Sequence, residues 1–208
     1  MEIIHEFISS SITAFLTGVL SPVAVMLISR YITYKKRTKD PLKEAAVHSE
    51  VICKVMDVIM EEVTCDRVWI SQFHNGGHFY PTGKSIQKFS MIYEAVSKDT
   101  YSIRHNFQNI PINLFSRSIN QLLDHDKIII TDYKDESIST FGLRYMAEET
   151  DCKSSYIFAL KSIDGKMLGI IGIEYTKRKK SLSDELYNGL KLHTVQIATL
   201  LDTFLHTK

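Results

Sequence analysis

The chain has 208 residues, of which 44% are hydrophobic and 10% aromatic, and its formal net charge is +1. This length provides one ordinary domain with an appendage, and the near-neutral charge argues against nucleic-acid binding, which usually requires a basic face. The three cysteines, Cys53, Cys65 and Cys152, are odd in number and form no C-x-x-C pair, so they fit neither a disulfide framework nor a zinc site. We interpret them as buried free thiols in a reducing compartment.

Residues 7–29 form the sharpest change in composition, because this run contains no charged residue. At about 1.5 Å per residue it is long enough to cross a hydrocarbon core about 30 Å thick. Glu2 and Glu6 precede the run and a basic cluster follows it within residues 30–39, so the positive-inside rule places the rest of the chain in the cytoplasm. We therefore predict a single-pass membrane protein. Residues 1–39 would be the transmembrane anchor with a basic juxtamembrane link, and residues 40–208 the cytoplasmic domain.

Two other interpretations of the apolar run remain. A secretory signal peptide would need a basic start and a small-residue cleavage site, whereas this start is acidic and the basic cluster follows the run. A buried helix of a soluble domain is the second alternative, since Gly18, Pro22 and several Ser and Thr residues dilute the run.

The domain is predicted to begin with one helix and two strands. Asp40 and Pro41 provide a capping carboxylate and a proline at the first helical position, and apolar residues then recur at helical spacing to about Thr64. Residues 67–74 alternate as a strand does, and residues 85–96 form a second strand. Between them, Asn75-Gly76-Gly77 is a strong turn signal.

The second half of the domain mixes short helices and strands. Asp164 and Gly165 separate two β-rich runs, which predicts a tight hairpin because both residues tolerate positive φ. Ser181 and Asp184 form a capping pair before the last helix. The expected elements are a short helix at 114–123, a strand at 127–131, a helix at 141–150, strands at 155–161 and 167–175, and a helix at 181–206. Strands joined by hairpins imply an antiparallel sheet with helices on one side.

This order of elements, together with several local sequences, resembles a GAF domain over about residues 42–204. The sequences that carry the resemblance are Asp66-Arg67-Val68 at the first strand, Asp132-Tyr133 after the third, residues 167–173 with Gly169 in the last strand, and residues 181–185 before the closing helix. PAS-like domains share much of this architecture and are the structural alternative. The expected fold is an α+β, GAF/PAS-like antiparallel sheet with N- and C-terminal helices packed on one face, preceded by one transmembrane helix.

The resemblance implies a small-molecule pocket on the other face of the sheet and a homodimer through the first and last helices. It does not imply the chemistries of particular family members. The N-K-x-F-x-D-E type of signature of cyclic-nucleotide binders is not present, and residues 101–150 contain no cysteine for a covalent bilin. Cys53 and Cys65 do not match the clustered cysteines of the methionine-sulfoxide reductases of this fold. No cofactor is therefore predicted.

The loop around the glycine pair is the most distinctive segment. His74 and His78 flank Asn75, Gly76 and Gly77, and glycine lets a backbone approach a ligand closely. Two histidines without a third ligand are a weak metal signal, so no metal site is predicted. We predict a binding loop here, and the alternative is a strand end with solvated polar side chains.

Aromatic residues are expected to line the pocket beneath the middle segments, because such pockets suit small molecules. For any single residue, ordinary core packing is the alternative. The predicted ligand-binding residues are His74, Asn75, Tyr93, Phe107, Phe115, Tyr133, Tyr156 and Phe158.

No catalytic motif is present: the sequence has no G-x-S-x-G elbow, no Walker loop and no G-x-G-x-x-G. We predict a non-enzymatic, membrane-tethered sensory or adaptor protein that binds an unidentified small molecule and signals through a protein partner. One alternative is a structural or protein-interaction module whose pocket is filled by side chains. Another is a redox or hydrolytic enzyme, which would require a converging cluster of cysteines or histidines and would be favoured if Cys65 and Cys152 were adjacent and exposed.

Overall fold

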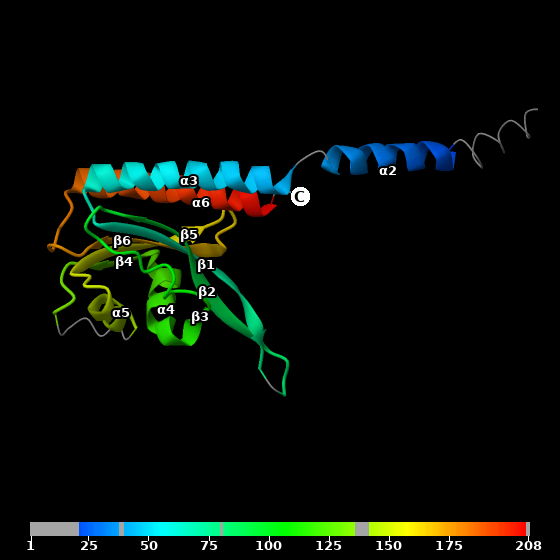
Figure 1. Ribbon diagram of the computed structural model, residues 1–208. Coiled ribbons are helices and arrows are strands. Elements are labelled where there is room, and N and C mark those ends of the chain that lie inside the picture. The colour runs from blue at the N-terminus through cyan, green and yellow to red at the C-terminus, as the bar shows by residue number, and fades with distance from the viewer. Residues whose placement is uncertain (1–20, 38–39, 80, 136–141, 207–208) are drawn as a thin grey trace, which may run out of the picture. The chain divides into compact units, whose positions relative to one another are not determined.

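A computed structural model describes residues 21–37, 40–79, 81–135 and 142–206 (Figure 1). The chain divides into two compact units, Met1–Val47 and His48–Lys208. The first unit contains helix α2 (Ser21–Arg37), and most of the predicted membrane segment at residues 7–29 lies outside the described residues. Within the described part of the chain, no helix combines the length and the apolar character needed to span a bilayer.

The second unit is built on one six-stranded sheet in which every neighbouring pair of strands is antiparallel. The strand order is β3-β2-β1-β6-β5-β4. The elements are α3 (Pro41–Val63), β1 (Arg67–His78), β2 (Ser85–Val96), β3 (Ile110–Pro111), the 3-10 helix η2 (Ile112–Phe115), α4 (Ser116–His125), β4 (Lys127–Ile130), α5 (Leu143–Glu149), β5 (Ser154–Lys161), β6 (Met167–Tyr175) and α6 (Asp184–His206). The predicted antiparallel α+β architecture is thus confirmed.

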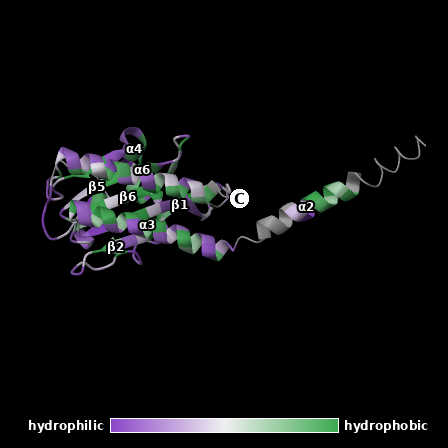
Figure 2. Ribbon diagram, turned by 90° about the horizontal axis from the view of Figure 1, so that it is seen from above, coloured by the Kyte–Doolittle hydropathy of each residue, from purple (hydrophilic) through white to green (hydrophobic). Residues whose placement is uncertain are grey.

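Helices α3 and α6 lie side by side across one face of the sheet, which we call the helix face (Figure 2). Each helix buries one stripe of aliphatic residues, as the periodicity predicted, and Asp40 accepts a hydrogen bond from the Leu42 amide at 3.0 Å as the predicted cap. The first and last helices cover the centre of the sheet in one continuous core. Its buried members include Ile52, Met56, Ile59, Val68, Ile70, Ile171, Ile173, Leu190, Ile197 and Leu201.

The opposite face, which we call the cavity face, is covered by α4, α5 and irregular segments (Figure 1). Trp69 lies at its centre, where Gly172 makes room for the indole: a Cβ on Gly172 would lie 2.2 Å from that ring. Gly169 is close to backbone, because a Cβ there would lie 2.3 Å from the Ser71 carbonyl oxygen. Both glycines are therefore required by close approach of their neighbours.

The hairpin between β1 and β2 differs from the prediction. The Asn75-Gly76-Gly77 sequence does not turn the chain, since β1 continues to His78 and the turn lies between Phe79 and Lys84. Gly77 has a φ of +107° and the register shifts between Asn75 and His78, so the glycines form a bulge within the strand. A local turn signal and a bulge require the same residue types, which is why the sequence did not separate them.

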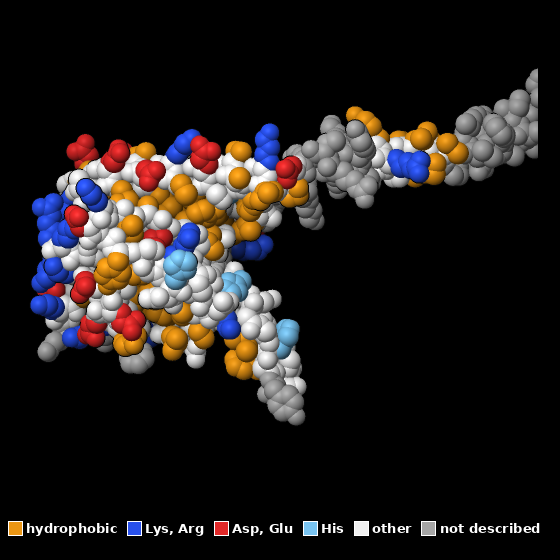
Figure 3. Space-filling view, viewed as in Figure 1, with side chains coloured by type: hydrophobic (Ala, Val, Ile, Leu, Met, Phe, Trp, Pro, Cys, Tyr) orange, Lys and Arg blue, Asp and Glu red, His pale blue; other side chains and the backbone are white. Residues whose placement is uncertain are grey.

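This longer hairpin extends beyond the sheet. β1 pairs with β6 only from Arg67 to Gln72, and from Phe73 to His78 it pairs with β2 alone. We call residues 73–79 and 81–89 the hairpin arm, and it projects from the body of the domain (Figures 1 and 3).

The other helices and strands lie closer to their predicted limits. The predicted short helix at 114–123 is the pair η2 and α4, and the tight turn at Asp164 and Gly165 is confirmed, with a φ of +80° at Gly165. The last helix begins at Asp184, and its hydroxyl cap comes from Ser183, which accepts from the Leu186 amide at 3.3 Å. The predicted capping pair of Ser181 and Asp184 is therefore wrong.

Candidate functional site

A small cavity lies inside the cavity face, between the sheet and helices α4 and α5. We call it the inner cavity, and its volume of about 30 Å³ is enough for a water-sized group. Its lining carries no charged side chain. The lining residues are Trp69, Ser71, Phe89, Met91, Phe107, Phe115, Ser118, Ile119, Leu122, Ile128, Leu143, Met146, Ile157 and Ile170.

Two serines supply the only side-chain hydroxyls of this lining. Ser71 is 1% exposed and Ser118 is 3% exposed, and neither hydroxyl has a hydrogen-bond partner within the described part of the chain. Burying an unpaired hydroxyl is unfavourable, so such a group is normally satisfied by a bound molecule. The inner cavity is thus an apolar chamber with two hydrogen-bonding positions.

A larger hollow of about 350 Å³ adjoins the inner cavity, and we call it the vestibule. Phe107, Phe115 and Met146 line both spaces, so these three side chains form the wall between them. The vestibule adds polar groups at its rim, from Asn106, Tyr145 and Glu149. The vestibule alone is of ordinary small-molecule size.

A buried ion cluster lies on the cavity face at the start of β1. The Arg67 side chain is 0% exposed, and its guanidinium lies 2.6 Å from Glu174 and 3.4 Å from Glu94. The Trp69 indole N–H also donates to Glu174, at 2.6 Å. Burial raises the pKa of Glu174, against the lowering effect of Arg67 and Trp69.

The same cluster fastens the segments that cover the cavity. Glu94 accepts hydrogen bonds from the backbone amides of Ile103, at 2.8 Å, and Arg104, at 3.1 Å. Arg67 donates to the Tyr101 carbonyl at 3.0 Å, and the Tyr101 hydroxyl donates to the Glu149 carbonyl of α5 at 3.0 Å. The covering segment is therefore held to the sheet by the buried Arg67 and Glu94, and α5 is joined to that segment through the Tyr101 hydroxyl.

Three of the predicted ligand-binding residues lie on the cavity face. Phe107 and Phe115 line both the inner cavity and the vestibule. Tyr133 is also buried on this face but lines neither space, and its hydroxyl bonds to that of Ser155 at 2.7 Å. Burial raises the pKa of Tyr133, which keeps the phenol protonated.

Tyr93, Tyr156 and Phe158 lie on the helix face, on the other side of the sheet from the cavity. The Tyr93 hydroxyl bonds to Ser49 of α3 at 3.1 Å, and the Tyr156 hydroxyl accepts from the Leu182 amide at 2.8 Å. In β5 the residue that faces the cavity is Ile157, so strand alternation puts its two aromatic neighbours on the opposite face. The prediction that they share a pocket with Phe107 is wrong.

His74, Asn75, Gly76, Gly77 and His78 lie in the hairpin arm and line neither the inner cavity nor the vestibule. His74 bonds to the Ser90 hydroxyl at 2.9 Å, and the side-chain amide oxygen of Asn75 accepts a hydrogen bond from the Ser85 hydroxyl at 2.9 Å. Among the described residues, no three His, Cys, Asp or Glu side chains are grouped to hold a metal.

Ser71 and Ser118 were missed by sequence reasoning. The available signal was a serine at a cavity-facing position of an otherwise apolar strand, after Val68, Trp69 and Ile70. The thiols differ from the prediction in one respect: Cys65 and Cys152 are buried, in the cores of opposite faces, but Cys53 is exposed. Burial raises the pKa of Cys65 to about 12. The described thiols thus lack the adjacent, exposed pair that a redox enzyme would require.

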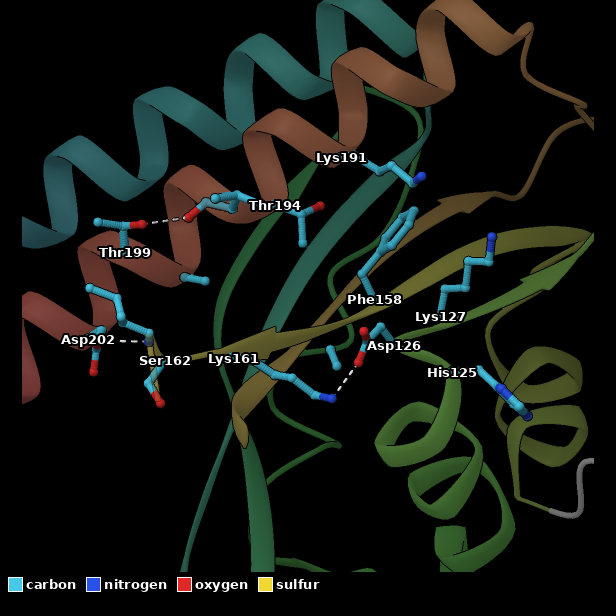
Figure 4. Close-up of a pocket in the computed structure, with 14 residues that line it drawn as sticks. His125, Asp126, Lys127, Phe158, Lys161, Ser162, Lys191, Thr194, Thr199 and Asp202 are labelled. Carbon is cyan, nitrogen blue, oxygen red and sulfur yellow. Dashed lines mark hydrogen bonds and ion pairs between the residues drawn. The ribbon is translucent and has the colours of Figure 1, made fainter. Parts of the chain in front are cut away.

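A second hollow, a groove of about 520 Å³, lies between α6 and the edge of the sheet at β4 and β5 (Figure 4). Phe158 forms part of its floor, and Lys161 pairs with Asp126 beside it. Lys127 and Lys191 also line the groove, with their ammonium groups 5.4 and 4.9 Å from the centre of the Tyr187 ring. Charged side chains line the groove, whereas the inner cavity is lined almost entirely by apolar ones.

Known structures share this architecture at low sequence identity. The blue-light absorbing form of the PixJ GAF domain from Thermosynechococcus elongatus matches with a TM-score of 0.62 and 12% identity, over 79% of this chain and 90% of that one. The photoproduct state of a GAF domain from Synechocystis sp. PCC6803 matches with a TM-score of 0.58 and 12% identity, over 75% and 94%. A far-red absorbing dark state with bound biliverdin matches with a TM-score of 0.54 and 12% identity, over 76% and 99%.

No model of a protein family and no curated protein sequence matches the chain. The structural likeness establishes the fold: the second unit has the GAF-domain fold that the sequence resemblance predicted.

Proposed function

We propose that this protein is a membrane-tethered sensory or adaptor protein whose GAF-type domain binds a small ligand and passes its occupancy to a protein partner. The inner cavity is the proposed ligand site, and the proposal is non-enzymatic. Residues 7–29 would be the tether, with the domain in the cytoplasm.

The observation that carries the ligand site is the pair of unpartnered hydroxyls in an apolar chamber. Ser71 of β1 and Ser118 of α4 come from opposite walls of the inner cavity, and both are buried. A ligand group that bonds to either hydroxyl would remove the cost of burying it. The vestibule, on the other side of the wall formed by Phe107, Phe115 and Met146, provides room for the rest of the ligand.

The chemistry of the lining favours a compact, uncharged and mainly apolar ligand. No charged side chain lines the inner cavity, so a carboxylate or phosphate there would be buried without a counter-ion. A bilin is bound in one of the similar structures, but no cysteine lines the inner cavity or vestibule of this chain, and we do not extend that ligand to it.

The two covering helices are the proposed route to the partner or to a second copy. Val51 and Val58 of α3 are 38% and 41% exposed, and Leu192 of α6 is 73% exposed. Exposed apolar residues on neighbouring helices favour association with another helical surface. The tether is supported by the uncharged run at residues 7–29 and by the basic residues that follow it.

One observation favours a second candidate function, a protein-interaction module without a ligand. The inner cavity holds only about 30 Å³, so most of the space beneath α4 and α5 is filled by side chains. In that case the domain would act through its surface alone.

Thermal melting of the full chain in detergent, against a panel of neutral metabolites, tests the ligand site. A ligand at about 100 times its dissociation constant stabilises by roughly 2.7 kcal/mol, which is a readable shift. We expect a shift that is reduced in Ser118→Val, which fills the cavity, and unchanged in Ser181→Ala, which changes an exposed serine outside the cavity. A flat panel from well-folded protein would instead favour the interaction module.

The tether is tested separately, by alkaline extraction of membranes that contain the full chain. We expect the protein to remain with the lipid, and deletion of residues 7–29 to release it. Release of the intact chain would disprove the tether and leave the ligand site unaffected.

A further inference from the structure

The hairpin arm carries basic side chains and no acidic ones. From Arg67 to Tyr93 the sequence contains no aspartate or glutamate, although the whole chain is nearly neutral. Within the arm, Lys84 is exposed and Lys88 is half-buried, and neither makes an ion pair in the described part of the chain. The arm is therefore a locally cationic projection on a protein that is otherwise close to neutral.

An aromatic residue stands at the tip of this projection. Phe79 is 55% exposed, and the turn that holds it is closed by two backbone hydrogen bonds of 2.8 Å, between Phe79 and Lys84 and between Gly83 and Phe79. Pro81 and Thr82 beside it are exposed. An apolar tip with lysines immediately behind it matches the depth profile of a membrane interface.

The arm is held in shape by its own side chains. Asn75 accepts hydrogen bonds from Ser85 at 2.9 Å and Gln87 at 3.0 Å, and the Phe73 and Phe89 rings contact each other edge to face. A two-stranded ribbon is marginal by itself, so these contacts keep the tip presented. The bulge at Gly77 interrupts the free edge of β1 and disfavours the addition of another strand, which leaves the side chains of the tip as the contact surface.

Within the second unit, the arm can be compared with the point where the chain enters the unit. α3 enters the second unit at His48, which stacks on Phe204 near the end of α6 with ring centres 4.4 Å apart. β1 returns antiparallel to α3, so the arm projects at the same end of this unit (Figure 1).

We propose that the hairpin arm is a membrane-surface contact, which places Phe79 in the interface and Lys84 and Lys88 against anionic lipid headgroups. This inference rests on the proposed tether, because two lysines and one phenylalanine make a weak contact that becomes effective only when the domain is already held at the membrane. Nucleic acid is disfavoured as the occupant because the remainder of the domain lacks the basic face that such a partner requires.

Hydrogen–deuterium exchange of the full chain in phosphatidylcholine vesicles, with and without phosphatidylserine, tests the contact. We expect the amides of residues 79–88 to exchange about tenfold more slowly in the anionic vesicles, and high salt to abolish the difference. The combined Lys84→Gln and Lys88→Gln variant should lose this protection, and Phe79→Ser should reduce it. The matched control, Lys98→Gln with Lys134→Gln, removes two exposed lysines outside the arm and should retain it.

These experiments distinguish failure of the tether from failure of the arm contact. If the chain does not sediment with phosphatidylcholine vesicles, the tether fails. If it sediments but phosphatidylserine does not slow exchange in the arm, the tether stands and the arm contact is disproved. Protection of the arm by a single-stranded oligonucleotide, without any effect of phosphatidylserine, would also overturn the lipid assignment.

Discussion

The two faces of the sheet bury similar numbers of apolar residues but are built differently. The helix face is closed by the long helices α3 and α6, whose aliphatic stripes meet the strands in a continuous core. The cavity face is closed by short helices and irregular segments, and it contains Arg67, Glu174 and the two unpartnered serines. One face thus supplies regular packing, and the other carries the polar groups that a ligand or a switch would use.

Among the changes considered, breaking the buried ion cluster should lower the free energy of unfolding most. Arg67→Met would leave Glu174 buried without its guanidinium partner, which typically costs about 3–5 kcal/mol of unfolding free energy. Urea denaturation measures the loss. Glu50→Gln is the control, because it breaks the exposed ion pair between Glu50 and Lys54, and it should leave the free energy of unfolding nearly unchanged. A loss below about 1 kcal/mol for Arg67→Met would show that the cluster is not structural.

Two serines of the cavity face should respond differently to replacement by alanine, with smaller changes in stability than Arg67→Met causes. Ser155→Ala leaves the buried Tyr133 hydroxyl unpaired and should destabilise by about 1–3 kcal/mol. Ser118→Ala removes a hydroxyl that has no partner and puts a good helix former in α4, so it should be neutral or stabilise by up to about 1 kcal/mol. Thermal melting without added ligand compares the two. Destabilisation by Ser118→Ala would mean that its hydroxyl is satisfied in the unliganded protein.

The last prediction concerns the chemical reactivity of the three thiols and involves no change in stability. Cys53 on α3 is exposed, so it should react with a maleimide in the folded protein, whereas the buried Cys65 and Cys152 should react only in urea. Partial burial raises the pKa of Cys53 above its usual value, so its rate should rise steadily with pH through the alkaline range as the thiolate forms. Mass spectrometry of the labelled peptides reads the result. Labelling of Cys152 in the folded protein would show that the cavity face opens.

The sequence was most informative where a pattern extends over many residues. The helices α3 and α6 and the β5–β6 hairpin follow from long periodicity and a tight turn signal. Strand alternation puts Tyr156 and Phe158 on one face of β5 and Ile157 on the other, but it does not say which face meets the helices, and so the two aromatic residues were assigned to the wrong face. Phe107 was placed correctly because its segment follows β2 and covers the sheet.

Two features were outside the reach of local patterns. The glycine pair at Gly76 and Gly77 has the composition of a turn, and only pairing with β2 shows that the strand continues through it. Ser71 is unremarkable in a strand, and its importance comes from Ser118, 47 positions along the chain, in the same chamber. Such pairings become visible only after the chain is folded.

The continuity of β1 has a mechanical consequence. One strand carries Arg67 in the ion cluster, Ser71 in the inner cavity and His78 near the tip of the arm. At about 3.3 Å per residue, the tip lies roughly 20 Å from Ser71, so a tilt of about 5° there would displace it by about 2 Å. A small rotation of β1 at the inner cavity would therefore produce a larger displacement at the tip of the hairpin arm.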